Sequence, residues 1–461
     1  MPTIVKQNET IKVPGIKPRV ESQSISDVNI FNPFTFKIGR IPMVNKVVVP
    51  AVVGRPEIKI PVPGEGLPRI VQFCADQSGC GFWRMLWPSD DLLSYNKAVV
   101  MNLYQMVLDP RFYGGLDAVR VQRQATDSQL EFMKFLRKTS NEFKRQTGKG
   151  FKILYDVDDI CAPADCIADY NVCKQGFTED KILQNMKAIV GMVDEMTVVS
   201  EYMKEHYKKH LEFDNISVLP NYAPKHIFDS SFDMNKIMFN YKKNRKKPRI
   251  LYAGSMTHFD VANRANQKDD FYHVVDFIFK DLTVDKRYEW VFMGGALPMK
   301  LRGFIGKGVE FHSWSPLPEY AQYVKNLNCQ IMLAPLVDNP FNKAKSNIKL
   351  TEGGMFGIPV IAQDLDCYNH NGWKYLFKTG AEMMNQIENI LKNEGTFRTA
   401  IEFGRKYSEQ YYLKDHLDEY ILLFTTPYGD EKRKNNKWFL GHNRGQFETC
   451  IETSTMTIKS P

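Results

Sequence analysis

A short stretch in the second half of the chain has the residues needed to bind a diphosphate. A helix is expected to begin near Ser346 and to end at Gly357, with Lys345 and Lys349 at its start. The N-terminus of a helix exposes unpaired N–H groups and a positive dipole end, which favour a phosphate. Glu352 lies one turn further on the same face, where its carboxylate could accept both hydroxyls of a ribose. The same spacing fits an ordinary amphipathic helix with solvated lysines equally well.

The spacing of cysteine and histidine residues does not indicate a metal site. Cys161, Cys166 and Cys173 lack the C-x-x-C spacing that presents two thiolates to zinc. His206 and His210 could share one face of a helix, but no glutamate lies between them as in the H-E-x-x-H motif. We expect buried or free thiols and a solvated helix face. Eight scattered cysteines in 461 residues also fit a reducing compartment.

The composition is typical of a globular protein, with 43% hydrophobic and 25% charged residues. The longest apolar runs, such as 189–193 and 331–336, are far shorter than the roughly 20 residues that span a bilayer. The first 16 residues are polar and do not resemble a signal peptide. We therefore expect a cytoplasmic protein with no membrane partner. The net charge of +8 permits a polyanionic partner without requiring one.

Two series of alternating strands and helices are predicted to position these residues. The first comprises strands at 69–74, 118–122, 151–155, 195–199 and 216–219, with helices at 128–146, 178–193 and 201–210. The second comprises strands at 249–253, 288–293, 309–312, 329–334 and 359–362, followed by helices at 382–392 and 396–412. Such alternation predicts parallel sheets covered by helices on both faces. The expected fold class is α/β, with two Rossmann-like domains facing across a ligand-binding cleft.

Composition shifts suggest the domain boundaries. Prolines and glycines end an N-terminal region, and the basic run at 242–249 is typical of a solvated linker. The expected parts are an N-terminal extension at 1–68, an acceptor domain at 69–223, a basic linker at 224–248, a donor domain with terminal helices at 249–424, and a loosely held polar tail at 425–461.

The string KSNIKLTEGGMFGIPVIA, at 345–362, resembles the donor-binding signature of retaining glycosyltransferases with the GT-B fold. Other segments follow in the order of that family: SGCGFWR, RVQRQ, ILYDVDDI, TVVSEYM, VLPNYAP, ILYAGSMTHFD, VFMGG and LAPLVDNPFNKAKS. The similarity covers about residues 69 to 410 and implies a nucleotide-diphosphate sugar, UDP-sugar being expected, as co-substrate. The family pattern has two glutamates eight positions apart, whereas this chain has Ala344 at the first position and Glu352 at the second. Asp338 and Asn342 are candidates to replace the missing glutamate.

The resemblance also implies roles for individual residues. The donor-binding residues would be Gly79, Gly81, Gly254, Ser255, His258, Trp314, Ser346, Asn347 and Glu352. Ser346 and Asn347 would donate backbone N–H groups to the phosphates, and Glu352 would hold the ribose. Lys345 and Lys349 would offset charge on the leaving group and count as catalytic. For His258 and Trp314, a purely structural role is almost as well supported.

The glycines and neighbouring polar residues are expected at two turns. Gly79 and Gly81 resemble a turn in the first domain that lets donor or acceptor approach the backbone. Gly254 and Ser255 resemble the turn in the second domain that faces the diphosphate, with His258 beside it.

The sequence Asp156-Val157-Asp158 also has the D-x-D spacing by which another, single-domain class of glycosyltransferases binds a metal ion. Because a helix end and two lysines already offer a diphosphate site, we predict a mechanism that requires no metal and no permanently bound cofactor. Asp158 and Asp159 are then expected on the cleft wall, as catalytic residues that orient the acceptor. The resemblance implies retention, with attack on the face that the phosphate leaves.

The acceptor is predicted from the basic balance and the long N-terminal region, which resemble those of T-even-like phage enzymes that glycosylate 5-hydroxymethylcytosine in DNA. Double-stranded DNA requires cations that contact phosphate and, for a base inside the duplex, base flipping. Arg84, Lys134, Arg137 and Lys138 are the candidates, although a solvated helix face explains the helical ones as well.

Three other functions share some of these sequence features. Transfer to a surface polysaccharide or lipid-linked glycan fits the donor motif equally well. An inactive DNA-binding protein on the same fold belongs to a different class. A dinucleotide-dependent oxidoreductase is disfavoured, because Arg84 stands where the third glycine of G-x-G-x-x-G would be.

Overall fold

The computed structural model describes residues 66–123, 125–171, 180–230, 232–260, 268–369 and 372–434. Every described residue belongs to one compact unit of the chain. The extension predicted at 1–68 and the tail predicted at 425–461 therefore lie largely outside the described residues.

The first half of the described chain is built on a six-stranded sheet in the order β2-β1-β3-β4-β5-β6, in which neighbouring strands run parallel. Its strands are β1 (Arg69–Phe73), β2 (Val99–Leu103), β3 (Ala118–Gln122), β4 (Lys152–Asp156), β5 (Glu195–Val198) and β6 (Ile216–Val218). Its longer helices are α2 (Trp87–Ser94), α3 (Asp127–Thr147), α4 (Lys181–Val190) and α5 (Glu201–Leu211), with the short α1 (Gly79–Gly81) before α2.

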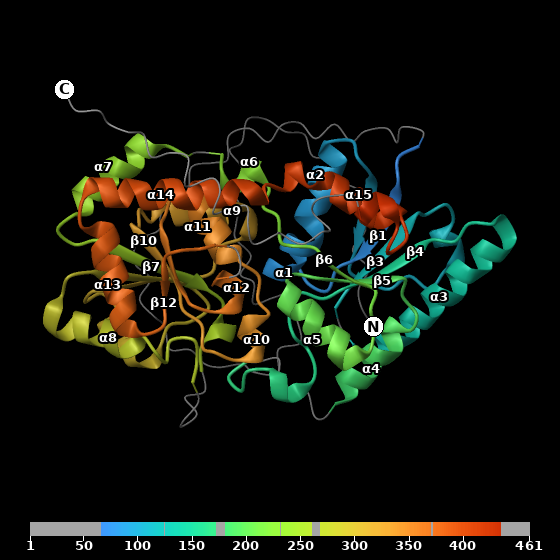
Figure 1. Cartoon of the computed structure of the whole chain (residues 1–461), viewed down its shortest axis with the longest axis horizontal. Coiled ribbons are helices and arrows are strands. Elements are labelled where there is room, and N and C mark those ends of the chain that lie inside the picture. Colours follow the sequence, from blue (N-terminus) through green and yellow to red (C-terminus); the bar gives the residue numbers. More distant parts are fainter. Residues whose placement is uncertain are drawn as a thin grey trace, which may run out of the picture. The chain divides into compact units, whose positions relative to one another are not determined.

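The second half contains another parallel six-stranded sheet, in the order β12-β11-β10-β7-β8-β9. Figure 1 shows β7, β10 and β12 of this sheet. Its strands are β7 (Arg249–Gly254), β8 (Glu289–Gly294), β9 (Val309–His312), β10 (Ile331–Ala334), β11 (Val360–Gln363) and β12 (Leu376–Phe377). Its helices are α8 (Val275–Lys280), α9 (Leu317–Asn326), α10 (Pro340–Lys343), α11 (Ile348–Phe356), α12 (Asp366–Asn369), α13 (Gly380–Leu391) and α14 (Glu394–Ser408).

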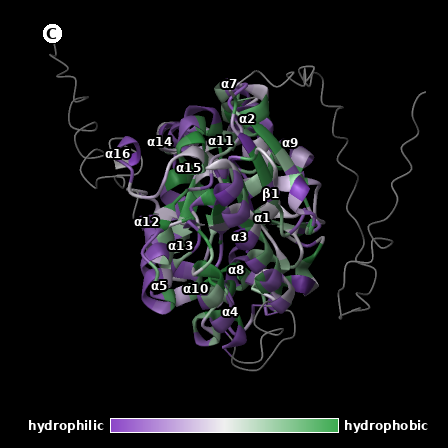
Figure 2. Ribbon diagram, turned by 90° about the vertical axis from the view of Figure 1, so that its right-hand side faces the viewer, coloured by the Kyte–Doolittle hydropathy of each residue, from purple (hydrophilic) through white to green (hydrophobic). Residues whose placement is uncertain are grey.

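Alternate side chains of each strand enter different hydrophobic cores, as the pleat of a β-strand requires. In β7, Leu251 and Ala253 pack in the core shared with α11, whereas Ile250 and Tyr252 pack in the core shared with α8 and α13. Both faces of the sheet are therefore covered, which is why its strands read as continuous apolar runs. Figure 2 shows the complementary pattern, with hydrophilic residues gathered on outer helices such as α5.

The strand orders place a ligand-binding crevice in each half. In the first sheet, β2 lies on one side of β1, and β3 and the later strands lie on its other side. In the second sheet, β8 and β9 lie on one side of β7, and β10 and the later strands lie on its other side. At such a switch point the loops that follow two neighbouring strands diverge, leaving a crevice beyond the carboxyl ends of the strands. The expected α/β class with two Rossmann-like sheets is confirmed.

The chain crosses between the halves at two neighbouring segments. Ala223 N donates to Tyr411 O at 2.8 Å, and Leu413 N donates to Ala223 O at 2.9 Å. The range 224–248, expected to be a linker, contains α6 (Lys225–Phe228) and α7 (Met234–Asn244). Met238 and Tyr241 on α7 are buried in the core of the second half, because the apolar face of this basic helix packs there.

The C-terminal part returns to the first half, which the sequence did not indicate. Helix α15 (Leu417–Thr425) contacts α2, and Lys152 Nζ on β4 donates to Leu423 O and Thr426 O, both at 2.7 Å. Beyond it, α16 (Glu431–Lys434) carries Arg433, whose guanidinium is buried against Glu195 on β5 at 2.6 Å. The residues up to 434 are thus tied to the first sheet rather than held loosely.

A buried carboxyl on α2 makes the stability of the fold depend on pH. Asp91 is 2% exposed, and burial, then the charge of Asp90, raises its pKa to about 7. In the unfolded chain an aspartate has a pKa of about 3.9. Between these values only the unfolded chain has lost the proton, so the free energy of unfolding falls as pH rises from about 4 to about 7.

We expect the Asp91→Asn variant, which mimics the protonated form, to be more stable than the wild type by roughly 2 to 4 kcal/mol above pH 7. The difference should vanish near pH 4. Urea unfolding at several pH values measures it, and an equal difference at all pH values would show that Asp91 titrates normally.

Candidate active site

A cavity of about 390 Å³ lies where the carboxyl ends of the two sheets meet. The first half lines it with Ser78, Gly79, Cys80, Trp83, Arg123, Asp158, Asp159, Asn171 and Asn221. The second half contributes Tyr252, Ala253, Gly254, Ser255, Thr257, His258, Met293, Gly294, Trp314, Ser315, Leu317, Tyr320, Ala334, Pro335, Leu336, Phe341, Lys345, Ser346, Ile348, Lys349, Glu352 and Tyr368. Both switch points therefore open into the same cavity.

The wall of the cavity formed by the second half leaves room for a ligand, because the last residue of both β7 and β8 is a glycine. Gly294 has a φ of 123°, and a Cβ built on it would overlap the carbonyl of Gly254. Only glycine allows two strand ends to approach so closely in this conformation. Gly254 and Ser255 thereby come to face the loop that carries Lys345 and Ser346.

The start of α11 concentrates positive charge at this wall. The helix begins at Ile348, two residues later than expected, and is preceded by Lys345 and Ser346. The Lys349 ammonium donates to the carbonyl of Ala253 and lies 3.7 Å from Glu352 Oε2. Two lysines beside the N-terminal end of a nine-residue helix form a site suited to a diphosphate.

Glu352 is held ready to accept hydrogen bonds from a ligand. Its carboxylate is 4% exposed and accepts a hydrogen bond from Tyr320 Oη at 3.1 Å. Burial raises its pKa, and the charge of Lys349 partly opposes that effect. A buried carboxylate with one fixed donor and free lone pairs can accept a pair of ligand hydroxyls.

His258 is oriented by a buried carboxylate. Its Nδ1 lies 2.7 Å from Asp270 Oδ2, and its ring borders the cavity. Asp270 Oδ1 also accepts hydrogen bonds from Tyr170 Oη and Asn342 Nδ2, each at 2.6 Å. Burial, and then the charge of Lys345, lowers the pKa of His258, which favours a neutral ring with its proton on Nδ1.

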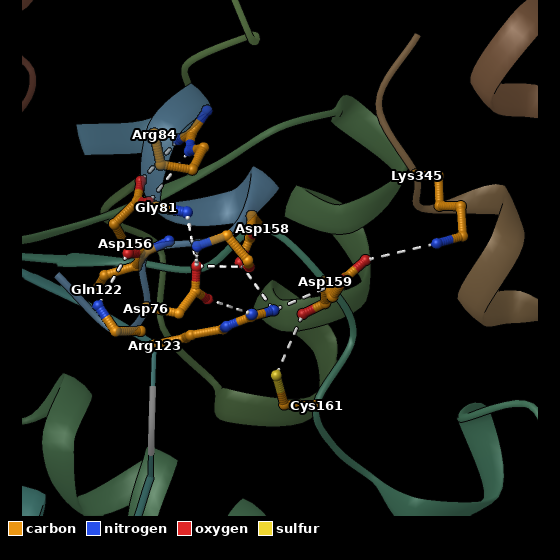
Figure 3. Close-up of polar contacts among 12 residues, drawn as sticks. Asp76, Gly81, Arg84, Gln122, Arg123, Asp156, Asp158, Asp159, Cys161 and Lys345 are labelled. Carbon is orange, nitrogen blue, oxygen red and sulfur yellow. Dashed lines mark hydrogen bonds and ion pairs between the residues drawn. The ribbon is translucent and has the colours of Figure 1, made fainter. Parts of the chain in front are cut away.

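The first-half wall is organised by Arg123, which directly follows β3 (Figure 3). Its guanidinium lies 3.0 Å from Asp76, 3.3 Å from Asp158 and 3.4 Å from Asp159. Across the cavity, Lys345 Nζ lies 3.9 Å from Asp159 Oδ1. Burial raises the pKa of Asp158, and the nearby Arg123 charge opposes this.

The D-x-D residues do not act together in the structure. Asp156 is fully buried and forms ion pairs with Arg84 and Arg120, each at 2.6 Å. Asp158 and Asp159 instead face the cavity, where the Arg123 guanidinium already lies beside both carboxylates. The positive charge at these two carboxylates is thus supplied by the chain itself.

Comparisons with known proteins were made for the sequence and for the structure. No protein-family model matches the sequence, and no curated protein matches it. Among solved structures, sucrose-phosphate synthase from Thermosynechococcus elongatus is similar with a TM-score of 0.52 and 13% identity, over 78% of this chain and 99% of that chain. HepE from Anabaena, in complex with UDP and glucose, is similar with a TM-score of 0.51 and 10% identity, over 77% of this chain and 98% of that chain.

These neighbours share the arrangement of two parallel sheets with interleaved helices. The chain has the GT-B fold. The expectation drawn from the donor motif is therefore confirmed for the fold, and the motif residues Lys345, Ser346, Lys349 and Glu352 line the cavity from the second half.

Most of the residues predicted for the site line the GT-B cleft. They are Gly79, Asp158, Asp159, Gly254, Ser255, His258, Trp314, Lys345, Ser346, Lys349 and Glu352. Gly81 does not line it, and its N–H instead donates to Asp76 Oδ1 at 3.0 Å, where a Cβ would overlap the Asp76 carbonyl. The Asn347 side chain is buried and donates to Tyr407 Oη at 2.7 Å, so the structure holds it inside the second half.

The cations predicted to contact DNA do not line the cleft. Arg84 is 1% exposed and bonded to Asp156, so its guanidinium is not available to a phosphate. On α3, Lys134 pairs with Glu131 at 2.6 Å, and Arg137 pairs with Asp194 at 2.9 Å. Lys138 shares a separate surface hollow with them.

Ala344, which stands at the position of the missing glutamate, is packed inside the protein. Ala344 is fully buried, and its carbonyl accepts a hydrogen bond from Ser200 Oγ on the first half at 2.9 Å. Neither candidate substitute borders the cleft: Asp338 pairs with Lys343 at 2.9 Å, and Asn342 is buried beside Asp270. The sequence motif could not show these contacts, because Ser200 and Asp270 lie far from Ala344 and Asn342 along the chain.

Arg123, Tyr320 and Asp270 were missed as site residues. Arg123 stands in the segment RVQRQ directly after a predicted strand, a position that points to the cleft in such folds. Tyr320 and Asp270 carry no signal of their own, since only tertiary packing brings them to Glu352 and His258.

Among the helices of the described residues, none is long and apolar enough to span a bilayer.

Proposed function

We propose that this protein is a glycosyltransferase that moves a sugar from a nucleotide-diphosphate sugar to an acceptor hydroxyl. The observation that carries the proposal is the juxtaposition of Lys345, Lys349 and the start of α11 with the buried carboxylate of Glu352. This arrangement offers cations to a diphosphate and, one helical turn away, a hydrogen-bond acceptor to a ribose.

UDP-sugar is the proposed donor. HepE, which shares the fold, was solved with UDP and glucose. In this chain the base would lie beside Trp314, which borders the cleft and is 49% exposed. Glu352 would accept both ribose hydroxyls, while Ser255 and Ser346 would contact the phosphates.

The proposed transfer retains configuration. The bond between the anomeric carbon and the diphosphate oxygen breaks, and the acceptor oxygen attacks from the side that the phosphate leaves. The acceptor proton passes to the departing phosphate. Lys345 and Lys349 stabilise the charge on the leaving group without requiring a metal ion.

The opposite wall is proposed to orient the acceptor. Asp158 and Asp159 border the cleft and are held in place by Arg123. A carboxylate there can accept a hydrogen bond from the acceptor hydroxyl and align it for attack.

For the acceptor itself we propose 5-hydroxymethylcytosine in double-stranded DNA. The net charge of +8 and the sequence resemblance support this acceptor. Arg84 does not, because its side chain is buried and cannot contact DNA. Transfer to a surface polysaccharide or lipid-linked glycan uses the same donor site and is the alternative outcome of the test.

The test combines the purified chain, a panel of UDP-sugars, and duplex DNA with either cytosine or 5-hydroxymethylcytosine. Nucleoside mass spectrometry should show a hexose or pentose mass gain only on the modified base, and Glu352→Ala should abolish it. UDP binding without DNA modification, together with extension of a glycan, would replace the DNA acceptor by a glycan. DNA binding without UDP binding would overturn the transferase proposal and favour an inactive DNA-binding protein.

A further inference from the structure

Three metal-binding side chains from two separate elements meet beneath the first sheet. Cys166 ends the short turn Ala164–Cys166, while His206 and His210 lie one turn apart on α5. A ligand atom from each side chain lies within 4.8 Å of the other two, and all three residues are half-buried. The sequence spacing could not reveal this cluster, because 40 residues separate Cys166 from His206.

The hydrogen bond of His206 leaves the lone pair of Nδ1 available to a metal. Its Nε2 lies 2.9 Å from the carbonyl oxygen of Ala162. Since a carbonyl only accepts, Nε2 carries the proton and Nδ1 keeps its lone pair. A ring that donates one N–H to a backbone carbonyl and binds a metal through its other nitrogen is the usual arrangement of a histidine ligand.

The second histidine is close to the first. The ring centroids of His206 and His210 are 4.5 Å apart, as expected for side chains four residues apart on a helix. In tetrahedral coordination, ligand atoms lie about 3.3 to 3.6 Å from one another. Ligand atoms within 4.8 Å of one another can reach this spacing by rotation of the side chains, because all three residues are only half-buried.

We propose that Cys166, His206 and His210 bind one Zn²⁺ ion, with a water molecule as the fourth ligand. One thiolate and two imidazoles suit zinc, whereas magnesium and calcium prefer oxygen ligands. On binding, the Cys166 thiol loses its proton to solvent and the thiolate sulfur bonds to the metal.

The zinc would fix the position of a functional loop rather than act on substrate. Residues 157–171 carry Asp158, Asp159 and Asn171 to the cleft, and Tyr170 to its bond with Asp270 in the second half. Zinc would join the middle of this loop to α5, whose N-cap Ser200 bonds to Ala344. The metal would therefore fix the position of Asp158 and Asp159 relative to the residues that line the cavity from the second half.

The test measures metal in the full-length protein, purified without chelators, loaded with zinc and dialysed against metal-free buffer. Mass spectrometry for elements should find about one zinc per chain. Cys166→Ser and His210→Ala should each lower this at least fivefold, whereas His273→Ala, an exposed histidine of the second half, should not change it. Circular dichroism confirms that the variants fold.

Replacement of zinc by Co²⁺ tests the ligand set directly. A thiolate-to-cobalt charge-transfer absorption should appear in the wild type and vanish in Cys166→Ser. Wild-type protein without zinc, or a Cys166→Ser variant that retains as much zinc as the wild type, would overturn the proposal. Neither readout depends on transferase activity, so the result is separate from the proposed function.

Discussion

Replacing Lys349 with alanine should lower kcat for sugar transfer about 100-fold. The lysine ammonium lies at the start of α11, bonded to Ala253 and beside Glu352, where charge would develop on the departing diphosphate. A donor aimed at such charge in a water-poor site stabilises the transition state more than the ground state, so kcat should fall more than KM rises. Steady-state kinetics with the UDP-sugar that the donor panel selects measures both.

Lys343→Ala is the matched control. Lys343 lies in the same segment but pairs with Asp338 and does not border the cleft, so its removal should leave kcat within about twofold. Similar losses in both variants would mean that general positive charge, rather than the position of Lys349, supports catalysis. An unchanged kcat in Lys349→Ala would contradict the leaving-group role.

Replacing Asp156 with alanine should lower the free energy of unfolding by about 3 to 5 kcal/mol. Its carboxylate is fully buried and bonds to Arg84, Arg120 and Thr197. Burial alone would raise its pKa, but the charges of Arg120 and Arg84 hold that pKa well below its usual range. Without the carboxylate, two buried guanidinium groups would lose the counter-charge that they share.

Chemical denaturation of the purified variant measures this loss. Asp418→Ala is the control, because Asp418 forms an exposed ion pair with Lys97, whose removal should change stability by less than about 1 kcal/mol. If Asp156→Ala were as stable as the control, water or a rearranged side chain would have to compensate the two arginines.

The fold was predictable because its signals are local. Strand β10 is apolar along its whole length, since both faces of its sheet are covered, and glycines mark where β8 and α11 end. The return of α15 to the first half was not predictable. Its apolar face fits either domain, and only the packing against α2 and Lys152 decides.

The second-half wall of the cavity was predictable for the same reason, since Lys345, Lys349 and Glu352 lie within one segment. The first-half wall was not, because Arg123 meets its three carboxylates only when β1, β3 and β4 are side by side. Arg84 is a residue for which the sequence motif led to a wrong prediction. A basic residue in a promising motif was assigned to DNA, but a buried aspartate 72 positions later holds it inside the protein.

The bond between Arg433 and Glu195 sets an order of events during synthesis. The first sheet ends at β6, yet Glu195 remains without its guanidinium partner until about 210 further residues have been made. At the usual rates of translation this interval is roughly 10 to 40 s. Throughout it, the surface of α2 that α15 will cover stays exposed, and Glu195 has Lys152 and Ser217 as its side-chain partners within the nascent first domain.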